Sequence, residues 1–352
     1  MKTAGVAYQN SDIRLHKNIL EIRDLFKYFP IRQSLTDSLM RKPSKTVRAV
    51  DGVSFNLRRG EVLALVGESG SGKTTIARTL IGLEEPTAGE ILFDGQLRFS
   101  SLEMSDPKIK AIPLKSLRQR VQMIFQDPYE SLNPRATITE IVSEPLEVHN
   151  LFLNRQERLD RVIQALEDAG LRPADEFLHR FPHELSGGQR QRVVIASAMV
   201  LDPELLLADE PVSMLDVSIR AEILNLLRDL RRQRGVSILF ITHDMGTVAY
   251  FANYLAVMYL GRIVESGETN QVLQNPQHPY TKALLSVVPV PNPRLRRQRF
   301  ILQGETPNPV DIPTGCRFHP RCPQIKGNCQ LTDPRMVSLS ENHQVACLQV
   351  NT

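Results

Sequence analysis

Residues 67–75 read Gly67-Glu68-Ser69-Gly70-Ser71-Gly72-Lys73-Thr74-Thr75 and contain every fixed position of the pattern G-x-x-x-x-G-K-[ST]. The apolar run 62–66 before them is typical of a strand buried on both faces, and residues 75–83 favour a helix. A strand, a glycine-rich loop and a helix in this order bring backbone N–H groups and a helix N-terminus to a phosphate. The alternative is a glycine-rich turn that matches the pattern by chance, but such a turn would not explain the strand before it and the helix after it. The stretch therefore predicts a phosphate-binding loop in which Lys73 bridges the β- and γ-phosphates and the Thr74 hydroxyl binds Mg²⁺.

The composition is that of an ordinary globular protein. The chain has 352 residues, 41% of them hydrophobic and 23% charged, which is enough for one large domain and a small one. Its 43 lysines and arginines nearly balance 39 acidic residues, so charge gives no support for a nucleic-acid partner. No signal peptide and no membrane-spanning stretch is expected. Any membrane role is therefore expected to be peripheral.

Strand and helix patterns alternate along the chain and predict an α/β fold with a parallel sheet. We expect an antiparallel layer from the early strands, and helices over 136–182. The polar residues 98–120 are predicted to form a loop. Strands are expected at 20–23, 49–57, 89–95, 121–125, 205–207 and 236–241, with a helix at 217–232.

The domain organisation follows from composition. Residues 1–18 are predicted to be a flexible leader and 19–275 a nucleotide-binding domain, with a helical subdomain at about 127–190. Prolines cluster from Pro276 onward, so 276–352 is expected to be an extension with little regular structure. Its basic segment 294–299 is interpreted as a solvated linker, with lipid headgroups or an acidic partner surface as alternatives.

Two carboxylates follow the apolar strand at 205–207. Asp209 at the strand end is predicted to hold Mg²⁺ through its water shell. Glu210, one residue further, points elsewhere and is predicted to polarise the attacking water as a general base. Behind an apolar strand in a chain with a phosphate-binding loop, this pair indicates nucleotide hydrolysis.

A second helix is predicted to begin within the stretch Leu185-Ser186-Gly187-Gly188-Gln189. Ser186 suits the N-cap position, and the two glycines let the backbone approach a phosphate closely. One chain cannot easily bring this helix onto its own phosphate-binding loop.

With these motifs in this order, residues 19–275 resemble the nucleotide-binding subunit of ATP-binding-cassette (ABC) transporters. The resemblance implies a P-loop NTPase fold with a parallel core sheet, an antiparallel β layer and a helical subdomain. It also implies that residues 185–189 close on ATP held by an opposite subunit. ATP binding would then close a dimer of two cassettes, and hydrolysis would reopen it to drive transport.

The resemblance assigns roles to further residues one at a time. Gln126 matches the loop glutamine that contacts Mg²⁺ or water and faces the membrane partner. His243 matches the histidine that contacts the γ-phosphate, and Asp216 matches the loop that communicates across the dimer. Phe29 fits the aromatic that stacks on adenine, with the adjacent Tyr28 as a competitor.

Two further stretches resemble the oligopeptide and dipeptide importer group: 126–134, QDPYESLNP, and 278–285, HPYTKALL, which opens that group's C-terminal extension. The resemblance implies a place on the cytoplasmic face of the cell membrane. It also implies two polytopic membrane permease subunits, an extracytoplasmic substrate-binding protein and a second ATPase subunit as partners. Tyr129 favours a heterodimer with a paralogue over a homodimer.

The sequence leaves the cargo and one other function class open. Peptides are the expectation from the group, and nickel complexes or glutathione are alternatives. A cassette ATPase acting on DNA or ribosomes is less favoured, because such proteins usually join two cassettes or insert long coiled coils.

Four cysteines lie in the tail at Cys316, Cys322, Cys329 and Cys347. A cytosolic location disfavours disulfides, so a metal site is the natural interpretation. The spacing is not that of a C-x2-C zinc ribbon. The resemblance implies a [4Fe–4S] cluster on the four thiols, with zinc or free thiols as alternatives. The tail could then act as a structural staple or as a metal-binding interaction or sensor module.

Overall fold

The computed structural model describes residues 17–31, 45–101, 111–152, 154–288, 302 and 304–350. The predictions for most of the leader and for the basic segment 294–299 lie outside the described residues. Within the described ranges, no helix is both long and apolar enough to cross a membrane.

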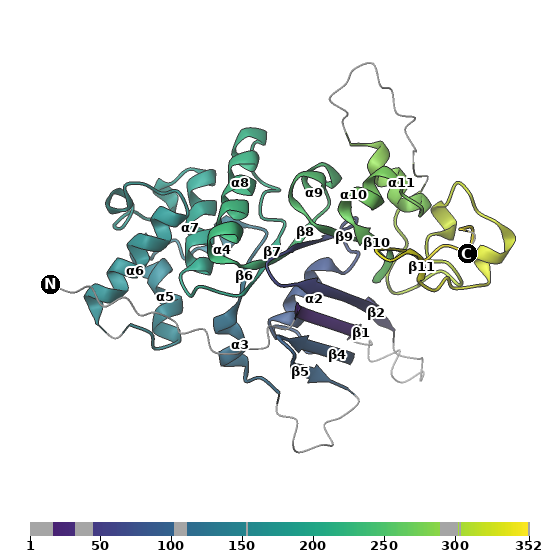
Figure 1. The fold of residues 1–352 in the computed structure, drawn as a ribbon, viewed down its shortest axis with the longest axis horizontal. Coiled ribbons are helices and arrows are strands. Elements are labelled where there is room, and N and C mark those ends of the chain that lie inside the picture. The colour runs from purple at the N-terminus through teal and green to yellow at the C-terminus, as the bar shows by residue number, and fades with distance from the viewer. Residues whose placement is uncertain are drawn as a thin grey trace, which may run out of the picture.

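An eight-stranded sheet forms the centre of the protein (Figure 1). Five of its strands pair in parallel, from β6 to β9 in space. Every residue of β3, β7 and β8 is buried, because apolar runs without alternation require cover on both faces of the sheet. In spatial order the strands are β11 (Val337–Ser340), β12 (His343–Val345), β10 (Arg262–Glu268), β9 (Tyr254–Tyr259), β3 (Val62–Val66), β8 (Ser237–Thr242), β7 (Leu205–Asp209) and β6 (Val121–Ile124).

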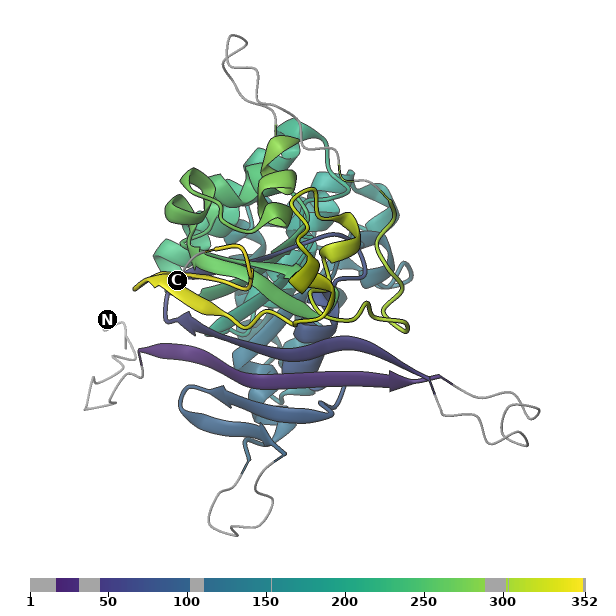
Figure 2. The ribbon, with the colours of Figure 1, turned by 90° about the vertical axis from the view of Figure 1, so that its right-hand side faces the viewer.

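A four-stranded antiparallel sheet lies beside the core sheet, as the sequence predicts (Figure 2). Its strands are β2 (Thr46–Arg58), β1 (Asn18–Pro30), β4 (Ala88–Phe93) and β5 (Gln96–Ser100) in spatial order. Helix α2 (Lys73–Leu80) follows β3, and its Ile76 and Leu80 belong to the apolar cluster shared by the two sheets. The phosphate-binding loop therefore joins two rigid elements.

The prediction of a loop over residues 98–120 is wrong at both ends of that range, and residues 102–110 lie outside the described residues. Strand β5 reaches Ser100, and α3 (Leu114–Arg120) precedes β6. Strand β5 lies at the edge of its sheet and is stabilised by pairing with β4, which polar composition does not reveal. Leu117 is the buried residue of α3, so the helix carries too little apolar periodicity to be recognised from sequence.

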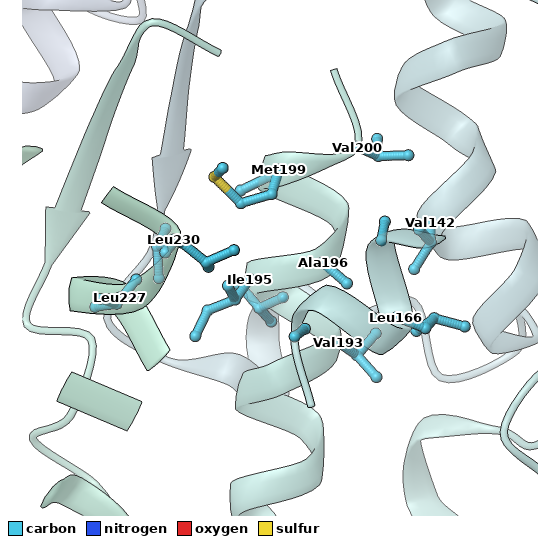
Figure 3. Packing of buried hydrophobic residues seen from close by; sticks show 14 of the residues in the cluster. Val142, Leu166, Val193, Ile195, Ala196, Met199, Val200, Leu227 and Leu230 are labelled. Atoms are coloured by element: carbon cyan, nitrogen blue, oxygen red, sulfur yellow. The ribbon is translucent and has the colours of Figure 1, made fainter. Parts of the chain in front are cut away.

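Helices beyond β6, here called the helical part, cover one face of the core sheet. They are α4 (Pro128–Ser131), α5 (Ile138–Val148), α6 (Arg155–Asp168), α7 (Gly187–Met199) and α8 (Val217–Arg234), with short 3₁₀ turns at Ala174–Glu176 and Pro182–Glu184. The predicted helical subdomain at about 127–190 includes only those that begin before residue 190. Figure 3 shows Ile195 of α7 on the side of Leu227 and Leu230 of α8, and Val193 and Ala196 of α7 on the side of Val142 of α5 and Leu166 of α6. Because α7 shares its core with all three helices, the position of its N-terminus is fixed by packing.

The C-terminal extension is attached to the edge of the core sheet. Strand β12 pairs antiparallel with β10, and β11 pairs with β12. The buried carboxylate of Glu265 in β10 accepts hydrogen bonds from the backbone N–H groups of Gln277 and His278, and lies 2.8 Å from Nε2 of His343. The remaining elements are α9 (Met245–Phe251), α10 (Thr269–Gln274), α11 (Pro279–Ser286), η3 (His319–Arg321) and η4 (Gly327–Gln330).

His278 makes a specific prediction about acid stability. It is buried at the N-cap of α11, where its Nδ1 accepts a hydrogen bond from the backbone N–H of Tyr280. Burial, with a smaller contribution from the charge of Lys282, lowers the pKa of His278 to about 3 from 6.5. The folded state therefore keeps His278 neutral while the unfolded chain binds a proton. We expect stability to fall, through this group, by roughly 1.4 kcal/mol per pH unit as the pH drops below the unfolded pKa.

His278→Asn tests this expectation, because asparagine can also cap a helix but does not ionise. The free energy of unfolding of the wild type and of the variant can be measured with denaturant at about pH 7.5 and about pH 5.5. Between these pH values the variant should lose less of this free energy than the wild type, by roughly 1.4 kcal/mol. Equal losses for the two proteins would show that His278 does not contribute to acid destabilisation.

Candidate nucleotide site

The phosphate-binding loop is shaped by its glycines and by Lys73. Gly72 has φ 103°, and a Cβ atom there would lie 2.1 Å from the carbonyl oxygen of Ala49. Lys73 is 4% exposed, and its Nζ donates to the carbonyl oxygens of Gly67 at 2.7 Å and Glu68 at 2.9 Å. Burial lowers the pKa of Lys73, while the negative charges of nearby carboxylates, Glu210 first, act in the opposite direction. The loop thus holds one buried ammonium at its centre.

Thr74 and Asp209 meet beside this loop. Thr74 Oγ1 donates to Asp209 Oδ1 at 3.2 Å, and Asp209 is 2% exposed at the end of β7. Burial raises the pKa of Asp209, the bond from Thr74 opposes this, and the charge of Glu210 adds to it. A buried carboxylate beside a hydroxyl suits Mg²⁺, which prefers oxygen ligands and would offset the cost of burying the charge. Thr74 and Asp209 therefore fit the predicted metal role.

Glu210 lies at the meeting point of three loops that follow parallel strands. Its φ of 46° is unusual for a residue with a side chain, and its backbone N–H donates to the carbonyl oxygen of Ile241 at 2.9 Å. Its carboxylate accepts from Gln126 Nε2 at 3.0 Å and lies 3.1 Å from His243 Nδ1. Because β6, β7 and β8 are parallel, their carboxyl ends bring these three predicted catalytic residues together.

A cavity of about 330 Å³ extends from the phosphate-binding loop toward β1. Phe29 lines it, whereas the hydroxyl of Tyr28 donates to Asp51 outside it, and burial raises the pKa of Tyr28 to about 12. Phe29 is thus the aromatic placed to meet a base. The lining residues are Phe29, Val47, Ala49, Ser69, Gly70, Gly72, Lys73, Thr74, Thr75, Gln126, Glu210 and Pro309.

Sequence reasoning missed Pro309, which reaches this cavity from the C-terminal extension. Its carbonyl oxygen accepts from the backbone N–H of Arg48 at 3.2 Å. No local pattern signals a contact between segments so far apart in the chain.

The stretch 185–189 lies apart from the phosphate-binding loop, and none of its residues lines the cavity. Figure 1 shows α7 among the helices of the helical part, away from α2. Ser186 is the N-cap of α7, as predicted, and forms a capping box with Gln189. Leu185 is buried in the helical core, and Asp216 is exposed at the N-cap of α8. The phosphate-binding loop and the predicted second half of the site thus lie at separate places in one chain.

The four cysteines of the extension are free thiols close to one another. The backbone N–H of Cys316 donates to the carbonyl of Cys329 at 2.8 Å. Burial, with smaller contributions from the other three thiols, raises the pKa of Cys316 to about 11. Nevertheless, no three His, Cys, Asp or Glu side chains in the described part of the chain are placed to hold a metal ion. The arrangement gives no support for the predicted cluster, which stays a prediction.

Comparison with known proteins decides the family. A family model described as ABC transporter matches residues 50–213, and one described as Oligopeptide/dipeptide transporter, C-terminal region, matches residues 264–329. The chain is 47% identical over 333 residues to the oligopeptide transport ATP-binding protein AppF of Bacillus subtilis. The matched residues are 94% of this chain and 97% of AppF. The chain belongs to the ABC transporter family. As a member of this family it is an ATPase that uses ATP and Mg²⁺.

Other relatives agree with this assignment. This ABC subunit is 45% identical over 341 residues to the dipeptide transport ATP-binding protein DppF of Haemophilus influenzae, covering 97% of this chain and 99% of DppF. Its fold matches cbiO1 of Clostridium perfringens, described as part of the ABC transporter complex cbiONQ, with a TM-score of 0.59, 29% identity and coverage of 74% and 92%. It also matches a dimeric post-hydrolysis state of the ATP-binding cassette MJ0796 bound to ADP and phosphate, with a TM-score of 0.58, 27% identity and coverage of 71% and 98%.

Proposed function

We propose that this ABC ATPase is the motor subunit of an importer of dipeptides or oligopeptides, bound peripherally at the cytoplasmic face of the cell membrane. The observation that carries the proposal is the match across the whole chain, cassette and extension together, to ATP-binding proteins named for peptide transport. In such a system the membrane and binding-protein subunits select the cargo. The test below therefore includes nickel complexes and glutathione as alternatives to peptides.

Each residue of the site has a proposed role in hydrolysis. Glu210 accepts a proton from the attacking water, and Gln126 and His243 hold its carboxylate in position. Lys73 and His243 place positive charge and hydrogen-bond donors where negative charge develops on the transferred phosphoryl group. Thr74 and Asp209 would hold Mg²⁺, which would supply positive charge to offset the negative charge of the phosphates. The structural support is that Lys73, Gln126 and Glu210 line one cavity and that His243 lies beside Glu210.

Two subunits complete each site in this proposal. The stretch 185–189 of one subunit would cover the phosphates on the loop of the other, because neither chain brings its own two halves together. Tyr129 is 59% exposed, Met214 56% and Val217 81%, so these apolar side chains are available for contact with partner subunits. A paralogous ATPase is the preferred partner, with a second copy of this chain as the alternative.

Purification of the tagged protein from its native membrane in mild detergent tests the proposal. We expect two polytopic membrane subunits and a second ATPase to accompany it. Vesicles containing this complex and its binding protein should then accumulate labelled dipeptides only when ATP is present. Recovery with ribosomes or DNA-associated proteins instead would overturn the transport proposal, and accumulation of nickel complexes or glutathione alone would overturn the peptide assignment.

We also propose that Cys316, Cys322, Cys329 and Cys347 together bind a [4Fe–4S] cluster. The support is chemical: the four cysteines are free thiols, and thiolates are the usual ligands of such clusters. Ligation would require the side chains to turn toward a common centre. Anaerobic purification followed by iron and sulfide determination should give about four of each per chain. One zinc ion per chain, or no metal, would overturn the cluster.

A further inference from the structure

Glu68, the second residue of the phosphate-binding loop, is held from three directions. Its backbone carbonyl accepts a hydrogen bond from Lys73 at 2.9 Å. Its backbone N–H donates to the hydroxyl of Tyr280 at 2.9 Å, and its carboxylate pairs with Arg321. Tyr280 and Arg321 are 212 and 253 residues further along the chain. The C-terminal extension therefore restrains both the backbone and the side chain of this residue.

The pair between Arg321 and Glu68 is bidentate and largely shielded from solvent. Nη1 lies 2.7 Å from Oε2 and Nη2 lies 3.1 Å from Oε1 of Glu68, and the arginine side chain is 8% exposed. Thr306 completes the contact, because its hydroxyl donates to the same carboxylate and accepts from Arg321. Two parallel bonds fix both distance and orientation, which a single contact does not.

The partners of Glu68 lie on a rigid support. The ring of Tyr280 is buried, with its centroid 4.8 Å from that of Tyr259 and 5.4 Å from that of Phe318. The guanidinium of Arg321 lies 5.9 Å from the centroid of Tyr259. Tyr259 ends β9, next to β3 in the core sheet, so the contact joins the loop to the sheet through the extension.

Other residues of the extension contact the antiparallel sheet and the nucleotide cavity. Arg317 pairs with the buried Asp51 of β2, whose carboxylate also accepts from Tyr28. Pro309 lines the nucleotide cavity beside Phe29. Figure 2 shows the yellow extension against the core sheet above the purple strands of the antiparallel layer. The same extension thus borders the nucleotide site near both the phosphate end and the base end.

We propose that Arg321 is a positioning residue of the nucleotide site. Through its bidentate pair with Glu68 it holds the phosphate-binding loop in the shape that receives ATP, so the C-terminal extension forms part of the ATPase. Glu68 does not line the cavity, which means that its carboxylate acts on ATP through the loop backbone.

Replacing Arg321 should weaken ATP binding with little effect on turnover at saturating ATP. For the full-length Arg321→Ala variant, calorimetric titration with ATP and Mg²⁺ should give a Kd raised roughly tenfold, because the loop is no longer held in place. KM for ATP should rise in parallel while kcat stays within about twofold. Arg321→Lys, which keeps the charge and one contact, should recover part of the affinity. Arg335→Ala, an exposed arginine of the same extension outside the cavity, is the matched control and should bind ATP like the wild type.

A double-mutant cycle separates positioning from general stability. The Kd for ATP of the double variant Arg321→Ala/Glu68→Ala should be no higher than that of the weaker-binding single variant, because both substitutions remove the same interaction. If Arg321→Ala fails to fold, Glu68→Gln takes its place and should still raise Kd several-fold. A folded Arg321→Ala or Glu68→Gln variant that melts earlier but binds ATP with the wild-type Kd would overturn the proposal. Calorimetry on the purified chain does not depend on cargo, so this failure would leave the import proposal intact.

Discussion

Glu210→Gln should bind ATP with unchanged affinity, form the closed dimer and lose nearly all turnover. Glutamine keeps the size of the side chain and a carbonyl oxygen for the contact with Gln126, but it cannot accept a proton from water at neutral pH. Loss of a positioned general base costs about 10²- to 10⁴-fold in rate, so kcat should fall within that range. Steady-state phosphate release and calorimetric ATP binding measure the two quantities separately.

The matched control for this variant is Glu204→Gln at the opposite end of the same strand. Glu204 pairs with Arg59 and Arg120, away from the cavity. Its replacement should lower stability slightly and leave kcat nearly unchanged. If Glu210→Gln retained wild-type turnover, Glu210 would not be the base, and the water would have to be activated by another group.

Lys73→Met should have the opposite effect, because it should weaken ATP binding itself. Lys73 is the buried ammonium at the centre of the loop, and hydrogen bonds from a charged donor to phosphate contribute up to about 3 kcal/mol. The Kd for ATP should therefore rise by roughly 100-fold. Methionine keeps an unbranched apolar stem of similar length, so the surrounding packing is changed less than by alanine.

Thermal unfolding and calorimetry on Lys73→Met test this prediction. Without nucleotide the variant should unfold cooperatively, which shows that it is folded, and added ATP should give it little of the stabilisation that the wild type gains from ligand binding. Wild-type affinity in the folded variant would contradict the assignment of Lys73 to the phosphates. Glu210→Gln and Lys73→Met together separate chemistry from binding in one site.

The parts of the site that could be predicted from sequence are those built by neighbouring residues. The phosphate-binding loop, the strand that ends at Asp209 and the capping box of Ser186 each depend on interactions within a few residues. The shape of such a segment follows from its own glycines, caps and apolar runs. The convergence of Gln126, Glu210 and His243 could be predicted in addition, because the carboxyl ends of parallel strands share one edge of the sheet.

Other features depended on contacts that no local pattern encodes. Tyr28 and Phe29 are adjacent on a strand and point to opposite faces, so only the pairing of β1 with β2 decides which of them lines the cavity. Strand β5 is polar at an edge and forms because β4 offers it hydrogen bonds. The clustering of four cysteines in the tail favoured a metal site, whereas no three metal-ligating side chains in the described part of the chain are placed to hold a metal ion.

The sequence by itself indicated a cassette ATPase, because the residues proposed to bind phosphate and activate water sit in short segments with their own strong structural preferences. Only the tertiary structure decided that the C-terminal extension belongs to the nucleotide site. Arg321 meets Glu68 across 253 residues of chain, and Pro309 lines the cavity beside Phe29. Such contacts are selected by the packing of the whole fold, and the identity of either partner alone gives no sign of the other.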